Sequence, residues 1–274
     1  MTQQSRQWKF EDLVEQFRTQ CDVQPGMTLI VHSSQKALGN VDGGVVTSVR
    51  AIKAAVTEQG TLLLPVFSSP PPDRVFKIKR TPSRVGLITE AFRRSEGVMR
   101  SLHPTHSVAA WGRRRDELLA GHDQTSGLGV DSPFHKAAKA GAQALMIGCD
   151  FTTLSLIHVA EAIVRTPYLG KVCYPGYDSP ITMIDYEGKA TAVPPVDVPT
   201  DSAAFKAVQQ ELDRRGGIRH CTLGDAKCLR FDAAACLDLT VEMLKADPAV
   251  LLCRNPRCCV CVPARKLVEE AGTK

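Results

Sequence analysis

The chain has 274 residues, of which 43% are apolar and 23% charged, and its formal net charge is +5. This length provides ample core for a folded domain, and the balance of apolar and charged residues excludes an intrinsically disordered chain. No apolar run approaches the ~20 residues that a membrane span requires. The N-terminal stretch MTQQSRQWKFEDL has no apolar segment of the secretory type, so we expect a cytoplasmic location and no membrane partner.

Strand-like and helix-like segments alternate along the chain. Apolar positions recur at helical spacing over 9–20, and MTLIVHSS (27–34) is a short β-run. Gly43-Gly44 precedes a helical pattern, and Gly60 introduces a second buried strand that ends before three prolines. Further segments follow in the same alternation: helical at 84–94, strands at 107–111 and 143–148, then a helix carrying LSLIHVAEAIVR (154–165).

The segment 170–200 is rich in Pro, Gly and β-formers, and hairpin cues surround Glu187-Gly188. Helical patterns return at 203–214 and 233–246. The alternation predicts an α/β fold with a central, mostly parallel sheet flanked by helices. We predict one domain over 1–274, with a β-rich inserted segment at 170–200 and a cysteine-rich tail at 253–261.

Basic residues form runs at 77–100 and at Arg113, Arg114 and Arg115. Such runs are typical of a solvated face, and only 5% of the residues are aromatic. Because no zinc-finger or RNP-type motif accompanies the charge, we expect no nucleic-acid partner.

Ten cysteines in a chain expected in the cytoplasm indicate thiols or a metal rather than disulfides. Zinc sites usually contain Cys-x(2–4)-Cys pairs, whereas the tail LLCRNPRCCVCVP shows x4 and x1 spacings and a vicinal pair. Two interpretations stay open: packed or exposed thiols, and a structural zinc held by Cys253, Cys258 and Cys261. His220, Cys221 and Cys228 lie upstream as additional ligand candidates.

His158 and Glu161 interrupt an otherwise apolar helical stretch. At i, i+3 spacing their side chains lie on one helix face and can touch. A buried imidazole is costly unless its nitrogens find partners, and a buried carboxylate costs more. The pair is either a satisfied core histidine or a general base with its orienting carboxylate.

Polar residues also follow the predicted strands, where ligands of open α/β sheets bind. The first strand delivers His32, Ser33 and Ser34 to its carboxyl end, and glycines then precede a helix N-terminus, where amides favour phosphate oxygens. The alternative is a tight loop without function.

Five segments together resemble the aminoglycoside 3-N-acetyltransferase family in order and spacing. They are VHSSQKALGNVDGG, GTLLLPVFS, RSLHPTHSVAAWG, GVDSPFHKAAKAG and LIHVAEA, and GDAKCLRF (224–231) resembles a later family segment. The resemblance runs from about residue 10 to 245. It implies an antibiotic-resistance enzyme that transfers an acetyl group from acetyl-CoA to a primary amine.

The resemblance also implies roles for individual residues. His158 is the expected general base, with Glu161 beside it. The coenzyme-binding positions are His32, Ser33, Ser34, Gly39, Val41, Arg100, Ser101 and His103. Ser155 stands where the family often has threonine. A Cys-His relay through Cys149 or Cys173 is an alternative that nothing in the sequence ties to the histidine.

An aminoglycoside is a polycation, so its site should be acidic. We expect Asp123, Asp131, Asp150 and Phe67 at the acceptor site. Because a chain of net charge +5 is an unusual host for a polycation, two alternatives stay open: a biosynthetic N-acyltransferase for another amine, and a non-catalytic CoA-binding protein. A homodimer is compatible with each of them.

Overall fold

The computed structural model describes residues 6–172, 174, 176–194 and 200–272. Its centre is a seven-stranded sheet of strand order β11-β12-β8-β2-β4-β7-β6. β2 pairs in parallel with both β4 and β8, while the outer pairs are antiparallel. By direction, β11, β8, β2, β4 and β6 run one way, and β12 and β7 run the other way. The predicted α/β fold with a mostly parallel central sheet is therefore confirmed, with antiparallel pairing on both flanks. The strands are β2 (Thr28–Ser33), β4 (Thr61–Pro65), β6 (Met99–Arg100), β7 (Val108–Gly112), β8 (Gln143–Ile147), β11 (Ile218–Leu223) and β12 (Ala226–Asp232).

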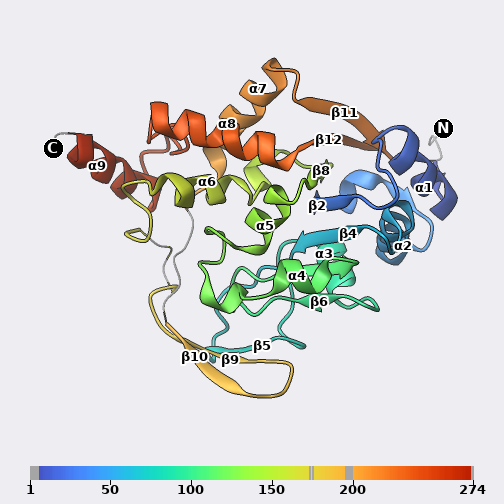
Figure 1. The fold of residues 1–274 in the computed structure, drawn as a ribbon, viewed down its shortest axis with the longest axis horizontal. Coiled ribbons are helices and arrows are strands. Elements are labelled where there is room, and N and C mark those ends of the chain that lie inside the picture. Colours follow the sequence, from blue (N-terminus) through green and yellow to red (C-terminus); the bar gives the residue numbers. More distant parts are fainter. Residues whose placement is uncertain (1–5, 173, 175, 195–199, 273–274) are drawn as a thin grey trace, which may run out of the picture.

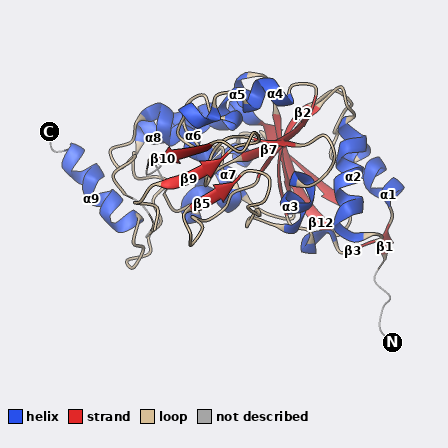
Figure 2. Ribbon diagram, turned by 90° about the horizontal axis from the view of Figure 1, so that it is seen from below, coloured by secondary structure: helices blue, strands red, loops and turns tan. Residues whose placement is uncertain are grey.

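Helices cover both faces of this sheet, because alternate side chains of the central strands point to opposite sides. On β2, Ile30 packs into one core, whereas Leu29 and Val31 pack into the other. Figure 2 shows α1 and α2 on one side of the strands and α6 and α8 on the other. One core holds α1 (Phe10–Thr19), α2 (Gly44–Val56) and α3 (Leu87–Arg93); the other holds α4 (Arg115–Leu119), α5 (Pro133–Lys139), α6 (Ile157–Val164), α7 (Lys206–Arg214) and α8 (Ala233–Ala246).

A hairpin within the segment 170–200 lies below the main sheet (Figure 1). Strand β9 (Ile181–Ile184) pairs antiparallel with β10 (Ala190–Val193) and in parallel with β5 (Val75–Lys77). A small two-stranded sheet joins β1 (Gln7–Trp8) to β3 (Asn40–Val41). The short 3₁₀ helices are η1 (Lys36–Leu38), η2 (His122–Gln124), η3 (Phe151–Thr153) and η4 (Ala203–Phe205). The final helix, α9 (Cys261–Gly272), lies at the opposite end of the molecule from α1 (Figure 1).

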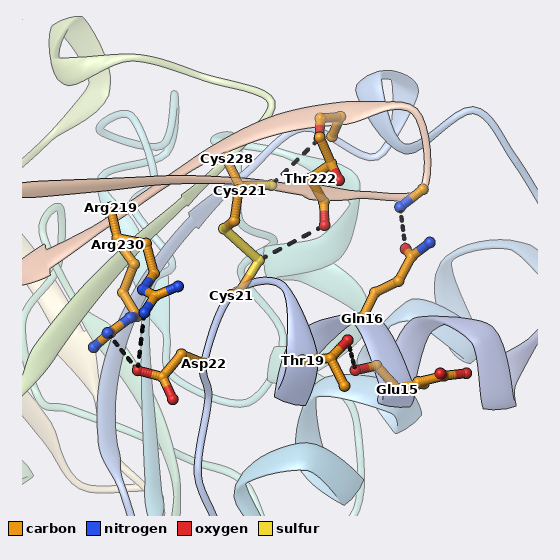
Figure 3. The surroundings of a disulfide bond; sticks show 12 residues. Glu15, Gln16, Thr19, Cys21, Asp22, Arg219, Cys221, Thr222, Cys228 and Arg230 are labelled. Carbon is orange, nitrogen blue, oxygen red and sulfur yellow. Dashed lines mark hydrogen bonds and ion pairs between the residues drawn. A yellow bond between two sulfur atoms is a disulfide. The ribbon is translucent and has the colours of Figure 1, made fainter.

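The expectation that the cysteines form no disulfide is wrong for one pair. Cys21, which follows α1, is bonded to Cys221 of β11 across a sequence separation of 200 residues (Figure 3). The packing of α1 against β11 brings the two residues together, and no local pattern announces that contact. Seven other cysteines are free thiols, and Cys173 lies outside the described residues.

Within the described part of the chain, no helix combines the length and apolar character needed to cross a membrane.

Candidate functional site

The main candidate site is a cavity of about 470 Å³ at the carboxyl ends of the central strands. His32 and Ser33 come from the end of β2, Pro65 and Phe67 from the end of β4 and the loop after it, and Cys149 from the loop after β8. Another side is closed by Ser155, just before α6, and by His158 in its first turn. The cavity therefore occupies the position where open α/β sheets bind ligands.

His158 and Glu161 form the pair that the i, i+3 spacing predicts. Their Nδ1 and Oε2 atoms are 2.7 Å apart. His158 is only 8% exposed but lines the cavity, and its ring meets Phe205 edge-on at a centroid distance of 4.7 Å. No hydrogen bond to another described residue engages Nε2, so this nitrogen is available to a ligand in the cavity.

The second oxygen of Glu161 is also fully engaged. Oε1 accepts hydrogen bonds from the Tyr168 hydroxyl at 3.0 Å and from the Thr200 hydroxyl at 2.8 Å. Burial and the neighbouring Glu161 charge raise the pKa of Tyr168, so its hydroxyl stays protonated and donates. Three donors thus satisfy a carboxylate that is only 1% exposed, and they fix its orientation toward the imidazole.

Two other imidazoles line the cavity without a carboxylate partner. Burial lowers the pKa of His32 to about 4, and its Nε2 has no partner among the described residues. Burial, followed by the charges of His158 and His122, lowers the pKa of His106 to about 3. Both rings are therefore neutral at neutral pH, and His158 is the one of these three imidazoles whose ring contacts a carboxylate.

The predicted coenzyme residues of the first loop divide between the cavity and the opposite core. His32 and Ser33 line the cavity. Ser34 Oγ accepts a bond from the Ala37 amide at 3.4 Å and is not among the lining residues. Gly39 has a φ of 79° and lies so close to Asp225 that a side chain there would collide with it. Val41 pairs with Trp8 in the small sheet, away from the cavity.

The second group of predicted coenzyme residues is bonded inside the protein. The Arg100 guanidinium donates to Ser107 Oγ at 2.7 Å and to the carbonyls of Val66 and Thr81. Ser101 Oγ accepts from the Val108 amide at 2.8 Å. His103 lines a smaller, separate cavity, and its Nε2 has no partner among the described residues.

The predicted acceptor residues are not gathered in the main cavity, apart from Phe67. Its ring meets that of His106 at a centroid distance of 5.0 Å. Asp123 lines the smaller cavity beside His103. Asp131 is exposed and lies 3.8 Å from Lys139 Nζ, and Asp150 caps η3 and pairs with Lys206 at 3.0 Å.

Cys149 lies in the cavity wall, but burial raises the pKa of its thiol. A raised pKa disfavours the thiolate that a Cys-His relay would need. No hydrogen bond between Cys149 and His158 is present in the described structure, and Cys173 lies outside the described residues.

The tail cysteines gather at a second place. The Sγ atoms of Cys253, Cys258 and Cys261 all lie within 4.8 Å of one another, and Cys259 is exposed. The upstream ligand candidates do not reach this cluster. Cys221 is disulfide-bonded, Cys228 lies beside it, and His220 pairs with Asp213 at 2.8 Å.

Comparisons with known proteins show the family of this chain. A family model described as aminoglycoside 3-N-acetyltransferase matches residues 30–245. The SPbeta prophage-derived aminoglycoside N(3')-acetyltransferase-like protein YokD of Bacillus subtilis (strain 168) is 31% identical over 236 residues, which cover 78% of this chain and 84% of that protein. This chain belongs to the aminoglycoside 3-N-acetyltransferase family.

The predicted family is thus confirmed, and with it the assignment as an acyltransferase. Solved structures of the family share the fold. A mutant of the aminoglycoside acetyltransferase AAC(3)-IVa in complex with a gentamicin superposes with a TM-score of 0.83 at 22% identity, covering 97% of this chain and 99% of that one. AAC-IIIb in a binary complex with CoASH gives a TM-score of 0.73 at 23% identity, covering 88% and 97%.

Sequence reasoning missed several residues of the site. Tyr168 and Thr200 hold Glu161 but lie in loops outside every motif, and Phe205 follows in η4. Arg84 lines the cavity, although the sequence shows it only as one of a run of basic residues. The only local signal is the close sequence distance of Tyr168 to the His158–Glu161 pair.

Proposed function

We propose that this protein transfers an acetyl group from acetyl-CoA to a primary amine, with His158 as the general base. The observation that carries the proposal is the Nδ1–Oε2 contact of 2.7 Å, which leaves Nε2 of this cavity-lining histidine for a ligand. The 3-amino group of an aminoglycoside is the leading acceptor, because relatives with this fold were solved with CoASH and with a gentamicin. We place this reaction in the cytoplasm, where acetyl-CoA is present.

The chemistry proceeds by direct attack in a ternary complex. The amine nitrogen forms a bond to the thioester carbonyl carbon while His158 Nε2 takes its proton. The carbonyl π electrons move to oxygen and return as the C–S bond breaks. Coenzyme A leaves as the thiolate and takes from the imidazolium the proton that came from the amine. Glu161 stabilises the positive imidazolium in between, since its carboxylate is held against Nδ1.

One observation favours a second acceptor class. Of the described residues that line the main cavity, none is Asp or Glu, whereas Arg84 brings a positive charge. A polycation gains little attraction from such walls, while the phosphates of coenzyme A or a smaller anionic amine gain more. A metabolic N-acyltransferase with a non-aminoglycoside acceptor is therefore the second candidate.

The test is thiol release from acetyl-CoA against aminoglycosides, simple amines and aminophosphonates, with His158→Ala as the variant. We expect kcat to fall by about 10²–10⁴-fold, the usual contribution of a general base, while coenzyme binding is retained. His106→Asn is the matched control, because it removes a cavity imidazole that has no carboxylate partner. Turnover of His158→Ala equal to that of His106→Asn would refute the base assignment.

The acceptor panel separates the two candidates. Release with an aminoglycoside supports the resistance-type activity, and release with other amines alone supports the metabolic one. No release with any amine, although coenzyme A binds, would refute both.

A further inference from the structure

The cysteine cluster near the C-terminus has the dimensions of a metal site. Tetrahedral zinc with Zn–S bonds of about 2.3 Å places its sulfurs roughly 3.8 Å apart. The three Sγ atoms of Cys253, Cys258 and Cys261 lie within 4.8 Å of one another. The fold brings together Cys258 and Cys261, which have the x2 spacing of zinc sites, and leaves the vicinal Cys259 exposed. Because only the x4 and x1 spacings were considered in the sequence, the Cys258–Cys261 pair was overlooked there.

The loop around Cys258 has the local geometry of a thiolate ligand. The Cys261 amide lies 3.3 Å from Cys258 Sγ and donates to it. Amide donors of this kind stabilise a negatively charged sulfur. All three thiols are buried, so three thiolates without a cation would be costly.

The Asp201 carboxylate approaches the cluster from a distant part of the chain. Its Oδ1 accepts from the Ala203 amide at 2.6 Å, which orients the carboxylate, and its Oδ2 lies 3.7 Å from Cys258 Sγ. Among the described residues, the donor atoms that all lie within 4.8 Å of one another are the three sulfurs alone, so Asp201 contacts the ligand Cys258 as an outer partner.

The cluster also contacts the residues that orient the catalytic carboxylate. Tyr168 packs in the same apolar cluster as the three cysteines, and its hydroxyl donates to Glu161 Oε1. Thr200, the neighbour of Asp201 in the chain, donates to the same oxygen at 2.8 Å. Both donors to Oε1 therefore stand next to the sulfur cluster.

We propose that the three thiolates of Cys253, Cys258 and Cys261 bind one structural zinc ion, with the Asp201 carboxylate held against Cys258. The ion fixes the tail loop against Tyr168 and Asp201, and it thereby positions Tyr168 and Thr200 against Glu161. Zinc fits this donor set, because thiolates select soft or borderline metals over Mg²⁺ and Ca²⁺. The three cysteines do not line the main cavity, so the ion takes no part in the chemistry there.

Metal content of the full chain, purified without chelator, tests the site. We expect about one zinc per chain, lost in Cys258→Ser and in Cys261→Ser. Cys259→Ser is the matched control, since it removes a neighbouring but exposed thiol, and it should keep the metal. Because a ligand variant can fail to fold, Co²⁺ exchange into the wild-type protein gives a second readout: thiolate–cobalt absorption of a tetrahedral site. Absence of zinc together with absence of that absorption would overturn the proposal, as would a disulfide between two of the three cysteines.

Asp201→Asn tests the link to the catalytic pair. We expect zinc affinity to fall by roughly tenfold, which is what loss of an outer-shell partner of a ligand can cost. The link to turnover rests on the proposed function. There, kcat should fall while KM for acetyl-CoA stays constant. Metal content is measured independently of enzymatic activity. A protein that contains zinc but acetylates no amine would therefore refute the proposed function without refuting the zinc site. Loss of zinc with unchanged kcat would instead refute the positioning role.

Discussion

The sharpest test of the site is Glu161→Gln, which keeps the shape of the side chain and removes its charge. Glu161 accepts three hydrogen bonds, from His158, Tyr168 and Thr200. A glutamine has one acceptor oxygen and one NH₂ group, so it cannot accept on both sides. If its oxygen faces His158, the two hydroxyls lose their acceptor. If its NH₂ faces His158, Nε2 must carry the proton and cannot take another.

The charge itself has a calculable effect. A carboxylate about 4 Å from the centre of an imidazolium stabilises it by about 4 kcal/mol at the effective dielectric constant of 20 that suits protein sites. This stabilisation develops only as the imidazole takes the proton, so its loss appears in the rate. A loss of about 4 kcal/mol corresponds to a roughly 10³-fold lower kcat. KM for acetyl-CoA should change little, because Glu161 does not line the cavity.

The assay is thiol release at saturating acetyl-CoA, compared between the wild type and Glu161→Gln. We expect kcat of the variant to be roughly 10³-fold lower, since the negative charge that stabilises the imidazolium is gone. Circular dichroism confirms that the variant is folded. A variant rate within a few fold of the wild type would refute the role of Glu161 in stabilising the imidazolium.

Three further variants test the Tyr168 contact, the buried His122 and the disulfide. Tyr168→Phe removes one donor to Glu161 and should lower kcat by roughly tenfold, in line with about 1.5 kcal/mol, the lower end of the range for a hydrogen bond to a charged group; an unchanged kcat would exclude the orienting role. Burial lowers the pKa of His122 to about 4, so below its unfolded value of about 6.5 the unfolded chain binds a proton that the folded chain does not. The free energy of unfolding should therefore fall on acidification, by about 2 kcal/mol between about pH 7.5 and 5. In urea titrations, the free energy of unfolding of His122→Gln should depend less on pH than that of the wild type. Cys221→Ser should lower the free energy of unfolding by about 2–4 kcal/mol under oxidising conditions and by nothing once the wild type is reduced, whereas equal losses in both states would contradict a disulfide contribution.

The parts of the fold and site that the sequence predicts are those set by local periodicity. Alternating strand and helix patterns predict the central sheet, and β2 does deliver His32 and Ser33 to its carboxyl end. The i, i+3 spacing predicts the contact of His158 with Glu161, because a helix turn fixes that distance. The resemblance of five ordered segments predicts the family, which the matched range 30–245 confirms.

The parts that the sequence does not predict depend on contacts between distant segments. Thr200 reaches Glu161 across 39 residues, and Cys21 reaches Cys221 across 200. Arg100 shows a second limit. A basic residue in a family motif suggests a phosphate ligand, yet burial and three internal acceptors hold this side chain in the fold. Composition cannot distinguish an arginine that binds a ligand from one that supports a loop.

The same limit applies to the charge of the site. A net charge of +5 describes the whole surface, whereas a ligand responds to the groups that line its cavity. Those walls carry neutral imidazoles at His32 and His106 and no carboxylate among the described residues. Asp150, the predicted acceptor aspartate nearest in sequence to the wall, already pairs with Lys206 at 3.0 Å. Arg84 adds a positive charge to the lining, so the described walls do not attract a polycation. In the proposed reaction, such walls favour binding of the amine in its unprotonated form, which is the form that attacks a thioester.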